Sequence, residues 1–271
     1  MSRSKRGARN RPVGGEPAEG KEHEPPVEVS GDDEPQDETG EDGQDAAADE
    51  APASPPDETP ASHPEAPAAD PRLARAKEAV ASGNVAVALE LYSDILRDNP
   101  GHVKALNNLG VLYDELGRHE AAVDHFRSAN ALDPDSVEVL TNLGASLGAI
   151  GRFDEAVSML RRAQRTAPGS TETRAALGIV HFRKGQYAEA ESELRWACES
   201  DADHGPAHYY RGEALNRLGH YPEAFAVLQR AAELLPEDAR VFYTLGRLLD
   251  REHKPGEAAE MYRRARALQK P

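Results

Sequence analysis

The chain has 271 residues, enough for one or two domains, and its formal net charge is −16 at pH 7. Residues 1–70 hold 6 basic and 19 acidic side chains, and the remaining residues hold 26 basic and 29 acidic ones. Such a chain lacks the extended basic face that phosphate attraction requires, which argues against general nucleic-acid binding.

Other simple features narrow the class of protein further. Cys198 is the only cysteine, which excludes an intramolecular disulfide and suits a reducing compartment. No run of about 18 apolar residues is present, so we predict no membrane span. The basic start is not followed by the apolar stretch of a secretory signal peptide. We therefore expect a cytoplasmic protein.

Residues 1–70 form the first segment along the chain. They hold 11 of the 20 prolines and no Phe, Trp, Tyr, Leu or Ile. With almost nothing to bury, this segment cannot offset its ordering entropy, and we predict a disordered, Pro-rich acidic tail with a short basic start. The tail is either a solvated segment without specific contacts or an acidic ligand, Asp32–Glu58, for a surface elsewhere in the chain.

From residue 71 onward the sequence repeats every 34 residues. Several residue types recur at this interval: Pro100, Pro134 and Pro168; Gly110, Gly144, Gly178, Gly212 and Gly246; Gly83, Gly117, Gly151, Gly185 and Gly219; and Ala88, Ala122, Ala156, Ala190, Ala224 and Ala258. Each unit contains two helical patterns. In the unit that begins at Val103, apolar residues follow a helical spacing until Gly117, and a second helix runs from His119 to the break at Asp133.

These units resemble the tetratricopeptide repeat. The unit 103–136 carries its signature as Leu109-Gly110, Tyr113, Ala122, Phe126, Ala129 and Pro134. The resemblance implies an all-α, right-handed superhelical solenoid of about six helical hairpins, with units at about 69–102, 103–136, 137–170, 171–204, 205–238 and 239–271. The signature is weakest at the ends: Arg75-Ala76 replace Leu-Gly in the first unit, so only its second helix is well supported, and His253 replaces the turn glycine of the last.

The recurring glycines within helices need a physical reason, because glycine weakens a helix interior by about 1 kcal/mol relative to alanine. We expect Gly144 and Gly178 to lie where the two helices of a hairpin approach so closely that a side chain would separate them. The recurring alanines serve the same purpose on the second helix.

The resemblance also implies that one helix of each pair lines a concave groove. A helical wheel places Asn108 opposite the core stripe and Asn107 at its flank, and Asn142 follows Asn108 by one period. We expect Asn108 and Asn142 to stack along the groove and to pair with a peptide backbone, although solvated surface amides are the alternative. Among the cations needed for a carboxylate clamp, only Lys77 fits, which argues against that arrangement.

Toward the C-terminus the groove is expected to become rich in Arg and Tyr, residue types enriched where binding energy concentrates. The predicted groove residues here are Arg183, Tyr209, Tyr210, Arg217, Arg240, Tyr243, Arg247 and Arg251. Arginine pairs with carboxylates, so an acidic peptide is the candidate ligand, and ordinary surface arginines are the alternative.

The sequence contains no P-loop, G-x-S-x-G or H-E-x-x-H motif, and we predict no enzyme, no cofactor and no metal site. His204 and His208 have a metal-like spacing without a third ligand. The preferred function is a protein–protein interaction scaffold or adaptor that binds an extended peptide or helix. The alternative is an RNA-binding helical-repeat protein. Self-association through poorly capped stack ends is a further expectation.

Overall fold

The computed structural model describes residues 70–269 and contains twelve α-helices in that range. Their bounds are α1 Pro71–Ala81, α2 Val85–Asp98, α3 Val103–Glu115, α4 His119–Leu132, α5 Val137–Ala149, α6 Phe153–Thr166, α7 Thr171–Lys184, α8 Tyr187–Ser200, α9 Gly205–Leu218, α10 Tyr221–Leu234, α11 Ala239–Arg251 and α12 Pro255–Leu268. The predicted tail lies outside the described residues, except for Asp70, whose carboxylate caps α1. None of these twelve helices is both long and apolar enough to cross a membrane.

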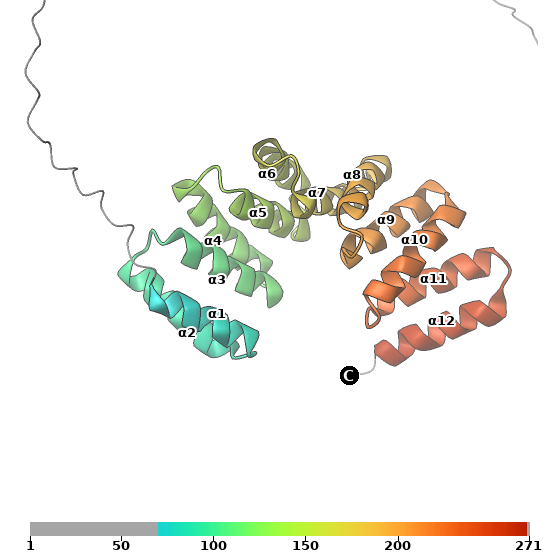
Figure 1. Ribbon diagram of the computed structural model, residues 1–271, viewed down its shortest axis with the longest axis horizontal. Coiled ribbons are helices and arrows are strands. Elements are labelled where there is room, and N and C mark those ends of the chain that lie inside the picture. Colours follow the sequence, from blue (N-terminus) through green and yellow to red (C-terminus); the bar gives the residue numbers. More distant parts are fainter. Residues whose placement is uncertain (1–69, 270–271) are drawn as a thin grey trace, which may run out of the picture. The chain divides into compact units, whose positions relative to one another are not determined.

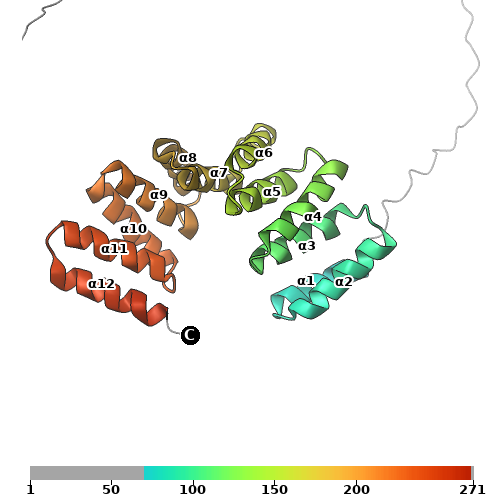
Figure 2. The same cartoon turned by 180° about the vertical axis from the view of Figure 1, so that it is seen from behind.

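The helices form six hairpins that follow one another in chain order (Figure 1). Each odd-numbered helix packs on the even-numbered helix that follows it, and that helix packs on the next hairpin. From α3 to α11 the odd-numbered helices also contact one another, whereas no two even-numbered helices within residues 70–269 pack to that extent. The row therefore curves with its odd-numbered helices inside, as the opposite view also shows (Figure 2). This arrangement confirms the predicted all-α solenoid.

The turn inside each of the first five hairpins is made by glycine in the left-handed region. The φ angles of Gly83, Gly117, Gly151, Gly185 and Gly219 lie between 71° and 85°. A Cβ atom at these five positions would meet nothing within 4 Å, so glycine is required there by backbone conformation and not by space. The last hairpin has no glycine to use, and His253 takes the same conformation with φ of 57°.

His253→Gly is expected to stabilise the domain. A side chain in the left-handed conformation costs roughly 1–2 kcal/mol, and glycine gives back part of this gain through the greater entropy of the unfolded chain. We expect a net gain of about 0.5–1 kcal/mol in the free energy of unfolding, measured by urea denaturation. The reverse change, Gly219→His, is the matched control and should lower the stability by a similar amount. Equal stabilities of His253→Gly and the natural chain would contradict this account.

The glycines within the odd-numbered helices lie where the helices of a hairpin touch. A Cβ atom on Gly144 would lie 2.5 Å from Leu160 Cγ, and one on Gly178 would lie 2.5 Å from Leu194 Cγ. The facing alanines Ala156 and Ala190 are fully buried. Both predicted close approaches are therefore confirmed, and the shared geometry explains why the same residue recurs in five units.

The first hairpin folds as two helices although its sequence supports only the second. Ala76 stands where the other units have glycine, and it is fully buried. It belongs to one apolar cluster with Tyr92 and Ile95 of α2 and with Leu109 of α3. Alanine is thus small enough for the close approach in this hairpin, and α1 begins the solenoid.

The fourth hairpin is joined to its neighbours by buried ion pairs as well as by apolar contacts. Glu191 of α8 accepts hydrogen bonds from Arg195 and from Arg211 of α9 and is only 8% exposed. Glu193, also 8% exposed, pairs with Arg161 of α6 and Arg174 of α7. These carboxylates fasten α8 to the hairpins on both sides.

Candidate functional site

A groove runs along the inner side of the solenoid at its third and fourth hairpins. Its volume is about 320 Å³, and it extends from the end of α3 across α5 and α7 to the start of α9. The floor consists of small or apolar side chains, and the rim carries both charges. The lining residues are Asp114, His119, Ala145, Ala149, Glu172, Ala175, Ala176, Ile179, Val180, Arg183 and His204.

The small residues of this groove are the part of the site that sequence reasoning missed. The position of Arg183 in α7 is occupied by Ala149 in α5, and that of Ile179 is occupied by Ala145. Residues four apart share a face of a helix, so the two alanines leave a gap between bulkier neighbouring units. Their occurrence outside the apolar core stripe was the available signal.

The rim carboxylate of Asp114 is held by two neighbours. Its Oδ1 atom accepts a hydrogen bond from Ser146 Oγ at 2.6 Å and lies 2.8 Å from His119 Nδ1. Ser146 belongs to α5 and is buried, so the contact joins two inner helices. The groove edge on this side is therefore fixed in position before any ligand binds.

The predicted stacking of Asn108 on Asn142 is wrong, because Asn142 pairs with Asn107. Asn142 Nδ2 donates to Asn107 Oδ1 at 3.0 Å, and Asn107 Nδ2 donates to Glu138 Oε1 at 2.8 Å. Asn107 is only 4% exposed. The hydrogen bonds between α3 and α5 join residues 31, 32 and 35 apart, since neighbouring inner helices do not lie in register. Asn107 therefore connects two hairpins and was wrongly placed at the flank of the face.

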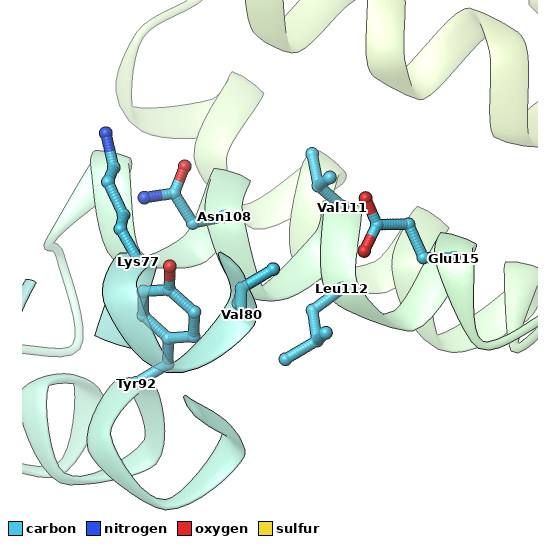
Figure 3. A pocket seen from close by; sticks show the side chains of 7 residues that line it. All are labelled: Lys77, Val80, Tyr92, Asn108, Val111, Leu112 and Glu115. Carbon is cyan, nitrogen blue, oxygen red and sulfur yellow. The ribbon is translucent and has the colours of Figure 1, made fainter. Parts of the chain in front are cut away.

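Asn108 lies instead in a pocket between the first two hairpins (Figure 3). The pocket has a volume of about 170 Å³, and Lys77, Val80, Tyr92, Val111, Leu112 and Glu115 also line it. The Nδ2 atom of Asn108 is buried and has no hydrogen-bond partner among residues 70–269. A ligand oxygen that entered the pocket would satisfy this donor, and a buried donor without a partner costs about 1–3 kcal/mol.

Three of the predicted aromatic and basic residues are engaged within the domain. Tyr209 is 9% exposed, and burial raises its pKa to about 12. The Arg240 guanidinium lies 5.0 Å from the Tyr209 ring and forms a bidentate ion pair with Asp238. This ion pair lowers the pKa of Asp238. Tyr210 packs edge-on against Tyr209 and Phe182.

The other predicted residues of this end are exposed. Arg183 lies on the rim of the groove. Arg217 and Arg251 each lie over a tyrosine of the preceding hairpin, and Arg247 is exposed on α11. Tyr243 is 52% exposed and packs at a tilt against Tyr262. The structure thus distributes the predicted set along three inner helices and does not gather it in one pocket.

The histidines and the cysteine have local structural contacts. His204 Nδ1 accepts a hydrogen bond from the Ala207 backbone N–H, and His208 Nε2 lies 3.1 Å from the Ala202 carbonyl oxygen. No group of three metal-ligating side chains occurs in the described part of the chain. Burial raises the pKa of Cys198 to about 11, so its thiol is protonated at neutral pH.

A family model described as tetratricopeptide repeat matches residues 73–137, 141–194 and 175–239, which make up more than half of the chain. No curated protein sequence matches the chain. Solved structures of low sequence identity share its fold. PilF of Pseudomonas aeruginosa has a TM-score of 0.62 at 20% identity, over 73% of this chain and 90% of that one.

Two further structures are similar in the same way. A tetratricopeptide repeat protein from Parabacteroides merdae has a TM-score of 0.62 at 18% identity, with 73% of this chain and 78% of that chain covered. A chain of the APC/C hetero-tetramer Cut9–Hcn1 has a TM-score of 0.69 at 18% identity, with 73% and 39% covered. At these identities the likeness concerns the fold alone.

Proposed function

Because this chain belongs to the tetratricopeptide repeat family, we propose that it is a non-catalytic scaffold for a partner protein. An extended segment or a helix of that partner binds along the inner side of the solenoid. The likeness of solved structures supports the fold on which this proposal stands. The partner and the place where it binds are inferred from the residues of this chain.

The groove across α3, α5 and α7 is the observation that carries the proposal. Its alanine floor leaves room for the side chains or backbone of a ligand, and Ile179 and Val180 offer apolar contact. Glu172 and Arg183 on the rim provide charges of both signs, which can fix the direction of a bound chain.

Asn108 supports an extension of this site toward the first hairpin. Its buried amide N–H donor lacks a partner within residues 70–269, and an extended peptide presents a carbonyl oxygen at every residue. Lys77 lines the same pocket and suits an acidic side chain of the ligand. We infer that the ligand backbone passes Asn108 and continues across the groove.

Photocrosslinking tests the proposal. The full chain carries p-benzoylphenylalanine in place of Ala145, an exposed residue of the groove floor, and is expressed in its native cell. We expect a crosslinked partner protein, identified by mass spectrometry. A peptide from the crosslinked region should then bind the natural chain, and Ala145→Trp, which fills the groove, should weaken this binding by about tenfold, or about 1.4 kcal/mol.

Ala226 provides the matched control, because it is an exposed alanine on an even-numbered helix, α10. The photoreactive residue at Ala226 should not capture the same segment, and Ala226→Trp should leave its affinity unchanged. Crosslinking that is equal at both positions, or an unchanged affinity of Ala145→Trp, would count against the groove. Crosslinking of Ala145 to RNA would favour the nucleic-acid alternative.

A further inference from the structure

Three arginines occupy the same position in three successive hairpins. Arg183, Arg217 and Arg251 lie 34 residues apart, in the last turns of α7, α9 and α11, and are called the Arg row here. All three are exposed. None forms an ion pair with a carboxylate of residues 70–269, in contrast to Arg211 and Arg240.

Two members of the Arg row are held in place by neutral partners. Arg217 Nη1 donates to the Tyr187 hydroxyl at 3.2 Å, and Arg251 Nη1 donates to the Tyr221 hydroxyl at 2.9 Å. The guanidinium carbons lie 5.7 and 4.6 Å from the centres of these rings. A tyrosine orients the guanidinium and leaves its positive charge and most of its donors available, so less entropy is lost when a carboxylate binds.

The acidic residues nearest to the Arg row have partners of their own. Asp250 precedes Arg251 and accepts a hydrogen bond from the Tyr262 hydroxyl at 2.6 Å. Glu252 follows Arg251 and pairs with Lys254 at 2.7 Å. Glu213 of α9 is buried and bonded to Thr244. The Arg row therefore presents one positive charge per hairpin along the inner helices.

The spacing of the Arg row suits carboxylates on an extended chain. The helices α7, α9 and α11 pack on one another in sequence, and packed helices have axes about 8–10 Å apart. An extended chain covers such a distance in about three residues. A ligand that places an acidic residue at every third or fourth position can therefore meet each arginine in turn.

The chain itself contains such a ligand. Residues 32–58 hold 12 acidic side chains and no lysine or arginine, and Glu34, Glu38, Asp42, Asp45 and Asp49 follow intervals of three or four residues. A flexible linker of the 38 residues from Asp32 to Asp70 has an average reach of roughly 35 Å. Attachment to the same chain also gives the segment a local concentration of about millimolar.

We propose that the Arg row binds the acidic segment Asp32–Glu58 of its own chain. The bound segment covers the C-terminal half of the inner surface, so an acidic partner must displace it to reach these arginines. This inference does not depend on the groove at Ala145, because it needs only the charges of the Arg row and of the segment.

Paramagnetic relaxation in the full chain tests the inference. A nitroxide is attached at Ala48→Cys in a Cys198→Ala background, so that it labels only the acidic segment. We expect selective broadening of the amide signals in the last turns of α7, α9 and α11, and little effect on the last turn of α3. Because the Debye length falls from about 10 Å at 0.1 M salt to about 3 Å at 1 M, the broadening should disappear in 1 M NaCl.

Two sets of variants make the result decisive. Arg183→Gln, Arg217→Gln and Arg251→Gln together should abolish the broadening. Arg75→Gln, Arg118→Gln and Arg165→Gln together remove the same charge from exposed arginines that also lack an ion pair in residues 70–269, and they should leave it unchanged. Replacement of the acidic residues of 32–58 by Asn and Gln should also abolish it, without any change to the folded domain.

Several outcomes would overturn the inference. These are equal broadening over all inner helices, broadening that persists in 1 M NaCl, and equal losses in the two arginine variants. Broadening that weakens on dilution would assign the contact to a second copy of the chain and would overturn the intramolecular site. Each of these results leaves the Ala145 crosslink untouched, so the two proposals fail separately.

Discussion

Replacement of Gly178 by leucine is expected to lower the free energy of unfolding by about 3 kcal/mol or more, measured by urea denaturation. A Cβ atom at this position would lie 2.5 Å from Leu194 Cγ and 3.2 Å from the Ala190 carbonyl oxygen. The leucine side chain can shift, but the backbone oxygen moves only if α7 and α8 separate. Gly178→Ala should cost less, about 1–2 kcal/mol, although alanine favours an isolated helix by about 1 kcal/mol.

Gly256 offers the matched control for this prediction. It lies within α12, and a Cβ atom there would meet nothing within 4 Å. Gly256→Ala should therefore be neutral or stabilise the domain by about 0.5 kcal/mol. If Gly178→Ala and Gly256→Ala changed stability in the same direction, the close approach of the helices would not be the reason for the recurring glycine.

Glu191→Gln is expected to lower stability by about 2 kcal/mol at neutral pH, because it removes the charge that pairs with two arginines in a nearly buried site. Burial tends to raise the pKa of Glu191, but Arg195 and Arg211 outweigh it and hold this pKa below the ordinary value of 4.5. A lowered pKa in the folded state means that the stabilisation is complete above about pH 4.5 and is lost as the pH falls through the folded-state value. The difference between the natural chain and the variant should therefore shrink as the pH falls below 4.5.

Urea denaturation of both proteins between pH 7 and pH 3 provides the measurement, with far-UV circular dichroism as the probe. Glu237→Gln is the control, because Glu237 is exposed and forms no ion pair within residues 70–269. It should leave stability nearly unchanged at every pH. A Glu191→Gln deficit that stayed constant down to pH 3 would show that lost packing, and not charge, causes it.

The fold could be predicted because each unit repeats the same physical requirements. Gly178 marks the close approach of two helices and Gly185 marks the left-handed turn, and both recur at one period in neighbouring units. One unit alone would be ambiguous, since glycine within a helix is also a helix-weakening residue. Recurrence removes this ambiguity, and it also allows the first hairpin to be included although Ala76 departs from the pattern.

The contacts between units could not be predicted in the same way. The period assigns a side chain to a position within its own unit, but not to a partner in the next one. Asn142 contacts Asn107 and not Asn108 because neighbouring inner helices are offset. Arg240 is taken up by Asp238, only two residues away, which a search at intervals of 34 residues does not consider.

The groove itself escaped prediction for a different reason. A hollow is made by side chains that are missing, and Ala145 and Ala149 resemble ordinary helix-forming residues when read one at a time. Only the curvature of the inner helices, together with the larger residues on both sides, turns these alanines into a floor.

The contacts of each hairpin reach only its immediate neighbours along the chain. The folding free energy of such a repeat domain is close to a sum of terms from single hairpins and from adjacent interfaces. Unfolding can then begin at either end and advance hairpin by hairpin, so cooperativity extends only as far as the interfaces are strong. A ligand that lies across several inner helices would couple hairpins that do not touch each other. Binding would thus make the whole row melt as one unit.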